Sequence, residues 1–268
     1  MTTKPLQKPI YFVEMIGNFA LRILEDTGQM LGFFVKALRS TANPPLRHQQ
    51  FLAQAEFVGV GSLFIILLTG VFTGAVFTLQ TVSALEQVGM ESMVGSTVML
   101  AVSRELAPVL TALMVTGRVG SAMATELGTM RVSEQLDAME VMAVDPIGYL
   151  VAPRIFACGL MVPALTVIFD VVAGIGAYMV AVGVLGIDEG AFLSRIEWFL
   201  DPYDFTHGIK KAFIFGILIS VVGCFKGFHA KGGARGVGMA TTQAVVIGSI
   251  SVFVLDYVLT ALLLIFEI

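Results

Sequence analysis

Five long apolar runs constrain the fold of this chain more than any other feature. The hydrocarbon core of a bilayer is about 30 Å thick, so a helix needs about 20 apolar residues to cross it. The runs that meet or approach this length cover residues 57–79, 93–115, 155–185, 212–228 and 244–266. Because lipid offers no hydrogen bonds to the backbone, each run must be helical. The sequence therefore predicts an all-α membrane protein with five transmembrane helices.

The composition agrees and excludes several classes of function. Charged residues make up only 13% of the 268 positions, about half of what a soluble domain carries. The net charge of −4 argues against nucleic acid as a partner. Two isolated cysteines and three scattered histidines predict no metal site. No phosphate-binding loop, dinucleotide fingerprint or hydrolase motif occurs, so we expect no catalysis and no cofactor on this chain.

Residues 10–39 predict a different kind of helix. One face carries polar side chains at helical spacing, and another carries Phe12, Ile16, Phe19 and Ile23; the polar residues are Glu14, Asn18, Arg22, Glu25, Gln29 and Lys36. Such a stripe indicates an amphipathic helix that lies in the membrane interface. Packing against a soluble partner is the alternative.

Basic residues predict the orientation. Of the 16 Lys and Arg residues, twelve fall on the side of the N-terminus: Lys4, Lys8, Arg22, Lys36, Arg39, Arg47, Arg118, Arg131, Arg154, Lys226, Lys231 and Arg235. The opposite side has only Arg195, Lys210 and Lys211, which this assignment places in a loop before the fourth span. The positive-inside rule then puts the N-terminus in the cytoplasm and the C-terminus outside.

The cytoplasmic segment 117–146 is too polar to span the membrane and reads as helical. Ser133 is a plausible N-cap for a helix that runs to about Asp145, before Pro146. Its apolar stripe consists of Leu136, Met139, Met142 and Ala143, opposite Glu134, Asp137 and Glu140. A short amphipathic helix below the membrane suits insertion into the groove of a partner. Packing under its own bundle is the alternative.

Four charged residues lie deep inside the apolar runs, away from their ends. Arg104 and Glu105 are adjacent in the second span, about 100° apart on a helix, so at least one must find a partner elsewhere. The arginine could meet an anionic ligand, or the two could tie helices together. Asp170 and Asp256 could relay protons or bond to neighbouring helices. Small residues at helical spacing, Gly70 with Gly74 and Gly117 with Ser121, favour close helix packing.

Two long segments resemble a known family. Residues 103–154 (SRELAPVLTALMVTGRVGSAMATELGTMRVSEQLDAMEVMAVDPIGYLVAPR) and 236–264 (GVGMATTQAVVIGSISVFVLDYVLTALLL) are similar to the MlaE-type (YrbE-type) permeases of ABC transporters that work with MCE proteins. With the interfacial helix and the five spans, the resemblance covers essentially all of residues 1–268 as a single permease domain.

The resemblance implies an ABC-exporter-like homodimer in a bacterial inner membrane. Each copy would dock on a cytoplasmic ATPase subunit that binds ATP and Mg²⁺, with an MCE-domain protein on the periplasmic side; some systems add a STAS-domain subunit. The cargo would be phospholipid, moved between the inner and outer membranes, which maintains the lipid asymmetry of the outer membrane.

The resemblance also implies roles for individual residues. The segment 117–146 becomes the coupling region, with candidate ATPase contacts at Glu126, Arg131, Glu134, Asp137 and Met139. Arg104 and Glu105 match a charged pair near a lipid cavity at the dimer interface, and Asp256 matches an acid in the last span. The cavity would be lined by Thr78, Leu79, Leu85 and Val88.

Three other functions compete with this interpretation. The main one is an ion-coupled secondary transporter that uses Asp170, Asp256 and Glu105, although no internal repeat is visible. An intramembrane lipid enzyme would need a base at depth, and all three histidines lie outside the predicted spans. A structural scaffold would leave Arg104 with no purpose beyond packing.

Overall fold

The computed structural model describes residues 7–41 and 48–266, and it confirms the all-α prediction over these ranges. Within these ranges, five helices are long and apolar enough to cross a membrane. They run over His48–Glu86 (α2), Glu91–Val132, Ile147–Ala181, Pro202–Phe228 (α9) and Gly233–Leu263, the last within α10 (Gly233–Phe266). Every span except the third covers its predicted apolar run to within about one turn. Each of these four also extends beyond the run at one or both ends, because polar residues continue the same helix.

The second span is a chain of shorter helical segments. The 3-10 turn η1 (Glu91–Met93) leads into α3 (Val94–Ala101), α4 (Ala107–Val115) and α5 (Ser121–Val132). Two π-helical turns, η2 (Val102–Leu106) and η3 (Thr116–Gly120), join the three α-helices. Pro108 lies in the first turn of α4, directly after η2, where a missing backbone N–H is tolerated. The helix therefore continues through residues 117–132, beyond the end of the apolar run predicted at residue 115.

The third span begins and ends earlier than predicted. The π-helical turn η4 (Ile147–Val151) leads into α7 (Ala152–Ala181), and the helix ends before residue 185. Gly186 has a φ of +70°, a conformation that terminates helices and favours glycine. A helix that the sequence did not predict follows, α8 (Glu189–Phe199), whose N-cap Asp188 accepts a hydrogen bond from the Ala191 amide at 2.8 Å.

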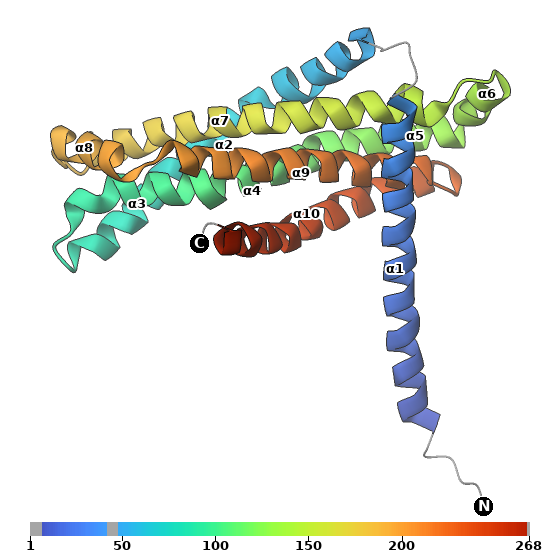
Figure 1. The fold of residues 1–268 in the computed structure, drawn as a ribbon, viewed down its shortest axis with the longest axis horizontal. Helices are drawn as coiled ribbons and strands as arrows, with labels where there is room; N and C mark the ends of the chain where they lie inside the picture. Colours follow the sequence, from blue (N-terminus) through green and yellow to red (C-terminus); the bar gives the residue numbers. More distant parts are fainter. Residues whose placement is uncertain (1–6, 42–47, 267–268) are drawn as a thin grey trace, which may run out of the picture.

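The long helices form one elongated bundle in which α9 is central (Figure 1). In the most apolar stretch of α9, 67% of residues are buried, against 22% in α2 and 11% in α10. Figure 1 shows α8 at one end of the bundle and α6 (Gln135–Val141) at the other. We call these the α8 end and the α6 end.

Glycines allow the closest helix approaches. A Cβ atom on Gly74 of α2 would lie 2.0 Å from the carbonyl oxygen of Ala173 in α7, and one on Gly176 would lie 2.2 Å from that of Val71. The predicted role of Gly74 in close packing is thus confirmed, whereas a Cβ atom on Gly70 would lie 3.4 Å from the carbonyl oxygen of Phe169, an ordinary van der Waals contact. A Cβ atom on Gly117 would have no neighbour within 4 Å in the described part of this chain, so the predicted close packing is not formed there within one copy.

The N-terminal helix α1 (Gln7–Thr41) lies crosswise to the bundle at the α6 end (Figure 1). Phe33 and Ala37 are buried where it crosses the bundle, and Ser40 donates a hydrogen bond of 2.7 Å to Asp145. Leu24 and Leu31 are exposed. A helix with this placement and exposed leucines suits the interfacial position predicted from its polar stripe. The side chains predicted to form its apolar face, Phe12, Ile16, Phe19 and Ile23, lie outside the described residues, as do those of Glu14 and Arg22.

Candidate functional site

The charged pair of the second span lies in the π-helical turn η2, and both side chains reach α9. Nε and Nη2 of Arg104 each lie 2.6 Å from Oδ1 of Asp204. Asp204 is 2% exposed, and its other oxygen accepts the Asp201 amide at 3.0 Å, which caps the start of α9. The prediction that this pair needs partners on other helices is confirmed, and of its two alternatives the structure shows the tie between helices.

Lys211 is the centre of the adjoining cluster. Its fully buried Nζ lies 2.6 Å from Oε2 of Glu105, 3.1 Å from Oδ1 of Asp256 and 2.7 Å from Oγ1 of Thr260. It also donates to the carbonyl oxygen of Arg104 at 3.3 Å. An ammonium group has three donors, so the lysine is fully satisfied although it lies within a membrane span. We call Arg104, Glu105, Asp204, Lys211, Asp256 and Thr260 the charge cluster.

Sequence reasoning missed both partners on α9. Lys211 was placed in a loop because the apolar run begins only at residue 212, whereas α9 begins at Pro202. A signal was present, since Asp204 and Lys211 are seven residues apart and so lie on one helical face, matching the opposite charges of Arg104 and Glu105. His207 also lies in α9 and is buried, which corrects its predicted position outside the spans.

Asp170 lies apart from this cluster. It is 3% exposed in α7, and its polar neighbour is Ser103 of η2. Asp256, by contrast, is a member of the charge cluster through Lys211. Within the described residues, Asp256 contacts Lys211 and Thr260.

The residues predicted to line a lipid cavity do not share one surface. Thr78 is buried, and its hydroxyl donates to the carbonyl oxygen of Gly74 at 2.8 Å. Leu79 and Val88 are exposed, while Leu85 is half-buried against the core. Leu79 and Val88 therefore remain available to a ligand or a second copy, whereas Thr78 belongs to the interior of this chain.

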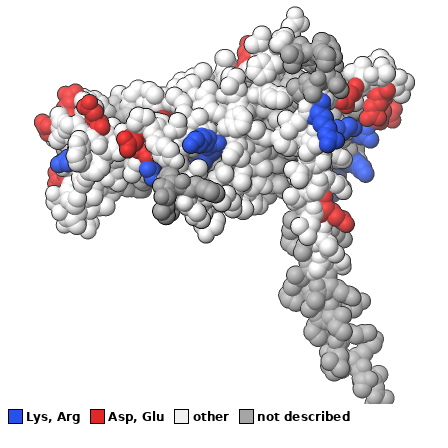
Figure 2. All heavy atoms as spheres, in the orientation of Figure 1, with Lys and Arg blue, Asp and Glu red and all other residues white. Residues whose placement is uncertain are grey.

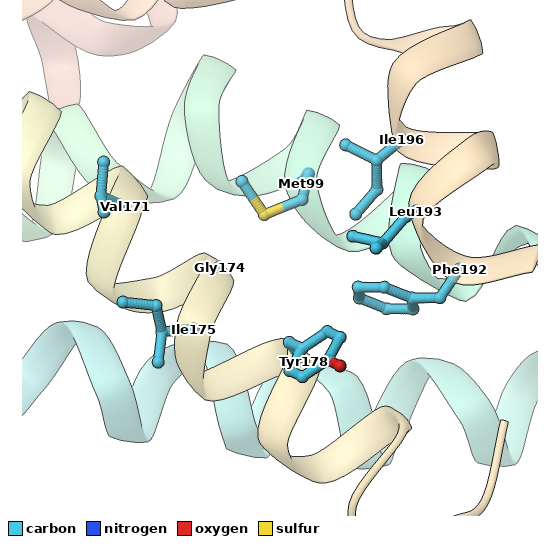
Figure 3. A pocket seen from close by; sticks show the side chains of 8 residues that line it. All are labelled: Met99, Val171, Gly174, Ile175, Tyr178, Phe192, Leu193 and Ile196. Carbon is cyan, nitrogen blue, oxygen red and sulfur yellow. The ribbon is translucent and has the colours of Figure 1, made fainter. Parts of the chain in front are cut away.

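An apolar cavity of about 310 Å³ lies at the α8 end (Figure 3). Its walls come from α3, α7 and α8, and the lining residues are Met99, Val171, Gly174, Ile175, Tyr178, Phe192, Leu193 and Ile196. The Tyr178 hydroxyl donates to Glu189 at 2.8 Å. The volume is at the lower end of the range for ligand pockets, about 300–1,000 Å³. None of the residues predicted to bind lipid lines it.

The predicted coupling helix is shorter than expected. Ser133 ends α5, and its hydroxyl donates back to the carbonyl oxygen of Thr129 at 2.8 Å, so it is not an N-cap. The next helix, α6, covers only Gln135–Val141. Its Leu136 is buried, Met139 is half-buried and Met142 beyond its end is 67% exposed. Of the predicted apolar stripe, Leu136 thus packs under the bundle, whereas Met142 is exposed at the tip.

The acidic side chains of this segment have distinct surroundings. Glu126 pairs with the buried Arg154 of α7 at 2.7 Å, and Arg131 pairs with Asp137 across the α5–α6 turn. Glu134 and Glu140 are exposed. Figure 2 shows acidic side chains at this end of the molecule. The arrangement presents negative charge around an exposed apolar tip, which is a surface that a basic-rimmed apolar groove would fit.

Two residues with positive φ bracket α6. Glu134 has a φ of 59° and Ala143 a φ of 58°, in the left-handed region that disfavours residues with a Cβ atom. We expect Ala143→Gly to raise the free energy of unfolding by up to about 1 kcal/mol and Ala143→Val to lower it by about 1–3 kcal/mol. Thermal unfolding of the purified protein measures both. Ala138→Gly inside α6 is the matched control and should destabilise; equal effects at positions 138 and 143 would contradict this explanation.

Comparisons with known proteins agree on one family. Residues 51–262 match the family described as Permease MlaE. The chain is 38% identical over 258 residues to the intermembrane phospholipid transport system permease protein MlaE of Haemophilus influenzae, covering 95% of this chain and 98% of that protein. It is 39% identical over 247 residues to a probable ABC transporter permease protein of Rickettsia bellii, covering 92% and 95%.

A plant protein is also similar. The chain is 41% identical over 210 residues to the chloroplastic protein TRIGALACTOSYLDIACYLGLYCEROL 1 of Arabidopsis thaliana, covering 78% of this chain and 60% of that protein.

Proposed function

Because the chain belongs to the MlaE permease family, we propose that it is the membrane-spanning subunit of an ATP-driven transporter that moves phospholipid between the inner and outer membranes. The proposal rests on the match to the Haemophilus influenzae permease named for intermembrane phospholipid transport, which covers 98% of the length of that protein. The five membrane-crossing helices supply the permease architecture. Hydrolysis of ATP, with its Mg²⁺, then belongs to a separate ATPase subunit.

The charge distribution supports an orientation. Lys226, Lys231 and Arg235 lie around the turn between α9 and α10, at the α6 end, as do Arg131 and Arg154. The α6 end is then cytoplasmic and the α8 end periplasmic, with α10 leading to a periplasmic C-terminus. We place the chain in a bacterial inner membrane. An MCE-domain protein on the periplasmic side would then contact the α8 end. A STAS-domain subunit, where present, would join on the cytoplasmic side.

The exposed helices support a homodimer. The most apolar stretches of α2 and α10 bury few residues within one chain, so a second copy can cover them. The Arg104 side chain is 38% exposed despite its ion pair with Asp204, and Leu79 and Val88 are exposed on and just beyond α2. Two copies would enclose apolar walls for acyl chains beside a guanidinium group that suits a phosphate.

The α6 segment supports coupling to the ATPase. It is fixed to the bundle by buried Leu136 and by the Arg131–Asp137 pair, so force applied to it reaches α5. Val141 and Met142 are 89% and 67% exposed at its tip. Closure of the ATPase on ATP would move α6 and α5 together and change the affinity of the cavity for lipid, which is transport by differential binding.

Retention of the ATPase tests this proposal. We expect Asp137→Lys together with Met142→Asp to abolish co-purification of the ATPase subunit and ATP-dependent lipid transfer, because both the charge and the apolar tip are lost. Met142 is preferred to Met139, which is half-buried. The matched control at the α8 end is Glu197→Lys with Met90→Asp, both exposed.

The result can also contradict the proposal. Lipid transfer that needs no ATPase and stops in Asp256→Asn would support an ion-coupled transporter instead. Failure of the wild-type chain to retain any ATPase would reject the ABC assignment.

A further inference from the structure

A second pocket lies at the α6 end, away from the charge cluster and from the cavity of Figure 3. It has a volume of about 390 Å³ and lies between α1, the end of α9 and the start of α10. The lining residues are Asp26, Gln29, Phe225, Lys226, His229, Ala230, Lys231, Gly236, Met239, Ala240 and Gln243. Nothing in the proposed transport path uses these residues.

Cationic side chains outnumber carboxylates around this pocket. Lys226 and Lys231 line it with a single carboxylate, Asp26. Nζ of Lys226 lies 3.4 Å from Oδ2 of Asp26, a long contact, and Lys231 is exposed and takes part in none of the ion pairs found in the described part of the chain. On the face seen in Figure 2, Lys and Arg gather where α1 crosses the bundle. The pocket therefore has unneutralised positive charge.

The backbone turn that carries Lys231 has a defined conformation. Gly232 and Gly233 have φ values of +93° and +67°, which make the tight turn between α9 and α10. A Cβ atom on Gly236 would lie 1.8 Å from the carbonyl oxygen of Lys231, so the first turn of α10 packs directly on the lysine backbone. His229 is fixed by a 2.9 Å contact between its Nδ1 and the carbonyl oxygen of Phe225.

The rest of the lining indicates an amphipathic ligand at the membrane surface. Phe225, Met239 and Ala240 supply apolar wall beside the polar amides of Gln29 and Gln243. The pocket lies where α9 ends at Phe228 and where α1 crosses the bundle, with Leu24 and Leu31 of α1 exposed. In the proposed orientation, with α1 in the membrane interface, this is the depth of lipid headgroups, where basic pockets between membrane helices bind anionic lipids.

We propose that this pocket binds the phosphate headgroup of an anionic membrane lipid, held by Lys226 and Lys231, with its glycerol and first acyl carbons against Phe225 and Met239. Such a lipid would be bound between α1 and the bundle rather than carried through the transporter. An acidic protein surface is a less suitable ligand because the apolar wall lies beside α1 at the level of the bilayer.

Lipid titration of the purified full-length protein in neutral detergent tests this proposal. Phosphatidylglycerol should raise the midpoint of thermal unfolding at lower concentration than phosphatidylcholine does. In Lys226→Gln with Lys231→Gln, the apparent affinity for phosphatidylglycerol should fall at least tenfold, while Lys210→Gln at the α8 end should leave it unchanged. Inorganic phosphate at the same concentrations should produce less than a tenth of the effect, since it lacks the acyl chains.

A second variant changes affinity in the opposite direction. Asp26→Asn removes the only carboxylate of the lining, and Asp26 is exposed, so the fold does not depend on it. We expect this variant to bind phosphatidylglycerol about threefold to tenfold more tightly. Misfolding would weaken binding, so it cannot produce this increase in phosphatidylglycerol affinity.

Three results would overturn the proposal. They are equal titrations for the two lipids, an unchanged phosphatidylglycerol affinity in the double lysine variant, and an equal response to inorganic phosphate alone. Loss of the ATPase subunit from the lysine variant with unchanged lipid affinity would assign the surface to a protein partner instead. The readout is binding rather than transport, so its failure is distinct from failure of the proposed function.

Discussion

Replacing Lys211 by methionine is expected to lower the free energy of unfolding by about 3–5 kcal/mol, the usual loss when one partner of a buried ion pair is removed. The change leaves Glu105 and Asp256 facing each other without the ammonium group that lies between them. It also removes the hydrogen bonds to Thr260 and to the carbonyl oxygen of Arg104. Unfolding of the purified protein, followed by circular dichroism in one detergent, measures the loss.

Lys210→Met is the matched control for this prediction. Lys210 is the adjacent residue, exposed on α9 with its ammonium group 5.2 Å from the centre of the Tyr203 ring. The same substitution there should change stability by less than about 1 kcal/mol, as for other exposed charges. Adding Glu105→Gln and Asp256→Asn to Lys211→Met should restore part of the loss, because the uncompensated carboxylates are removed. Equal losses at positions 210 and 211 would contradict the role of the charge cluster.

Gly74→Ala is expected to destabilise the protein by about 1–3 kcal/mol, the typical cost of inserting atoms into a packed interior. The added Cβ would lie 2.0 Å from the carbonyl oxygen of Ala173, and a backbone atom cannot rotate away as a side chain can. The helices α2 and α7 must therefore separate, which also loosens the reciprocal contact of Gly176 with Val71. The same unfolding measurement in detergent detects the change.

The control substitution is expected to change stability in the opposite direction. Gly238 lies inside α10 with nothing within 4 Å of its added Cβ. Gly238→Ala should therefore stabilise the protein by up to about 1 kcal/mol, since alanine is the better helix former. A loss of stability at position 238 equal to that at position 74 would show that the alanine effect is not one of helix contact.

Sequence patterns predicted the five membrane helices because hydrophobic length is a strong signal, but they predicted helix ends poorly. The fourth predicted run began at residue 212, after the adjacent charges of Lys210 and Lys211, although the helix begins at Pro202. Ser133 misled for another reason. A serine hydroxyl can cap the next helix or bond back to the preceding turn, and only the tertiary structure decides that it contacts Thr129.

The candidate site shows the same limit. Arg104 and Glu105 were predictable as a functional or structural pair because charge inside a membrane demands compensation. Their partners on α9 could not be predicted, because the second span and α9 are about 100 residues apart in sequence. Periodicity within a helix does not indicate which helices contact each other. Thr78 and Leu79 illustrate the remaining uncertainty, because adjacent residues on one helix face the interior and the exterior respectively.

The position of Lys211 has a consequence for how the protein is made. Each charged residue at the centre of a helix opposes insertion by about 2.5–3.5 kcal/mol, and α9 carries Lys211 within its buried face. Ribosomes synthesise the chain from its N-terminus, so Glu105 is already in the membrane when α9 leaves the translocon, and Asp256 arrives last. Integration of α9 is therefore coupled to the second span, which carries Glu105, and is completed by α10, which carries Asp256.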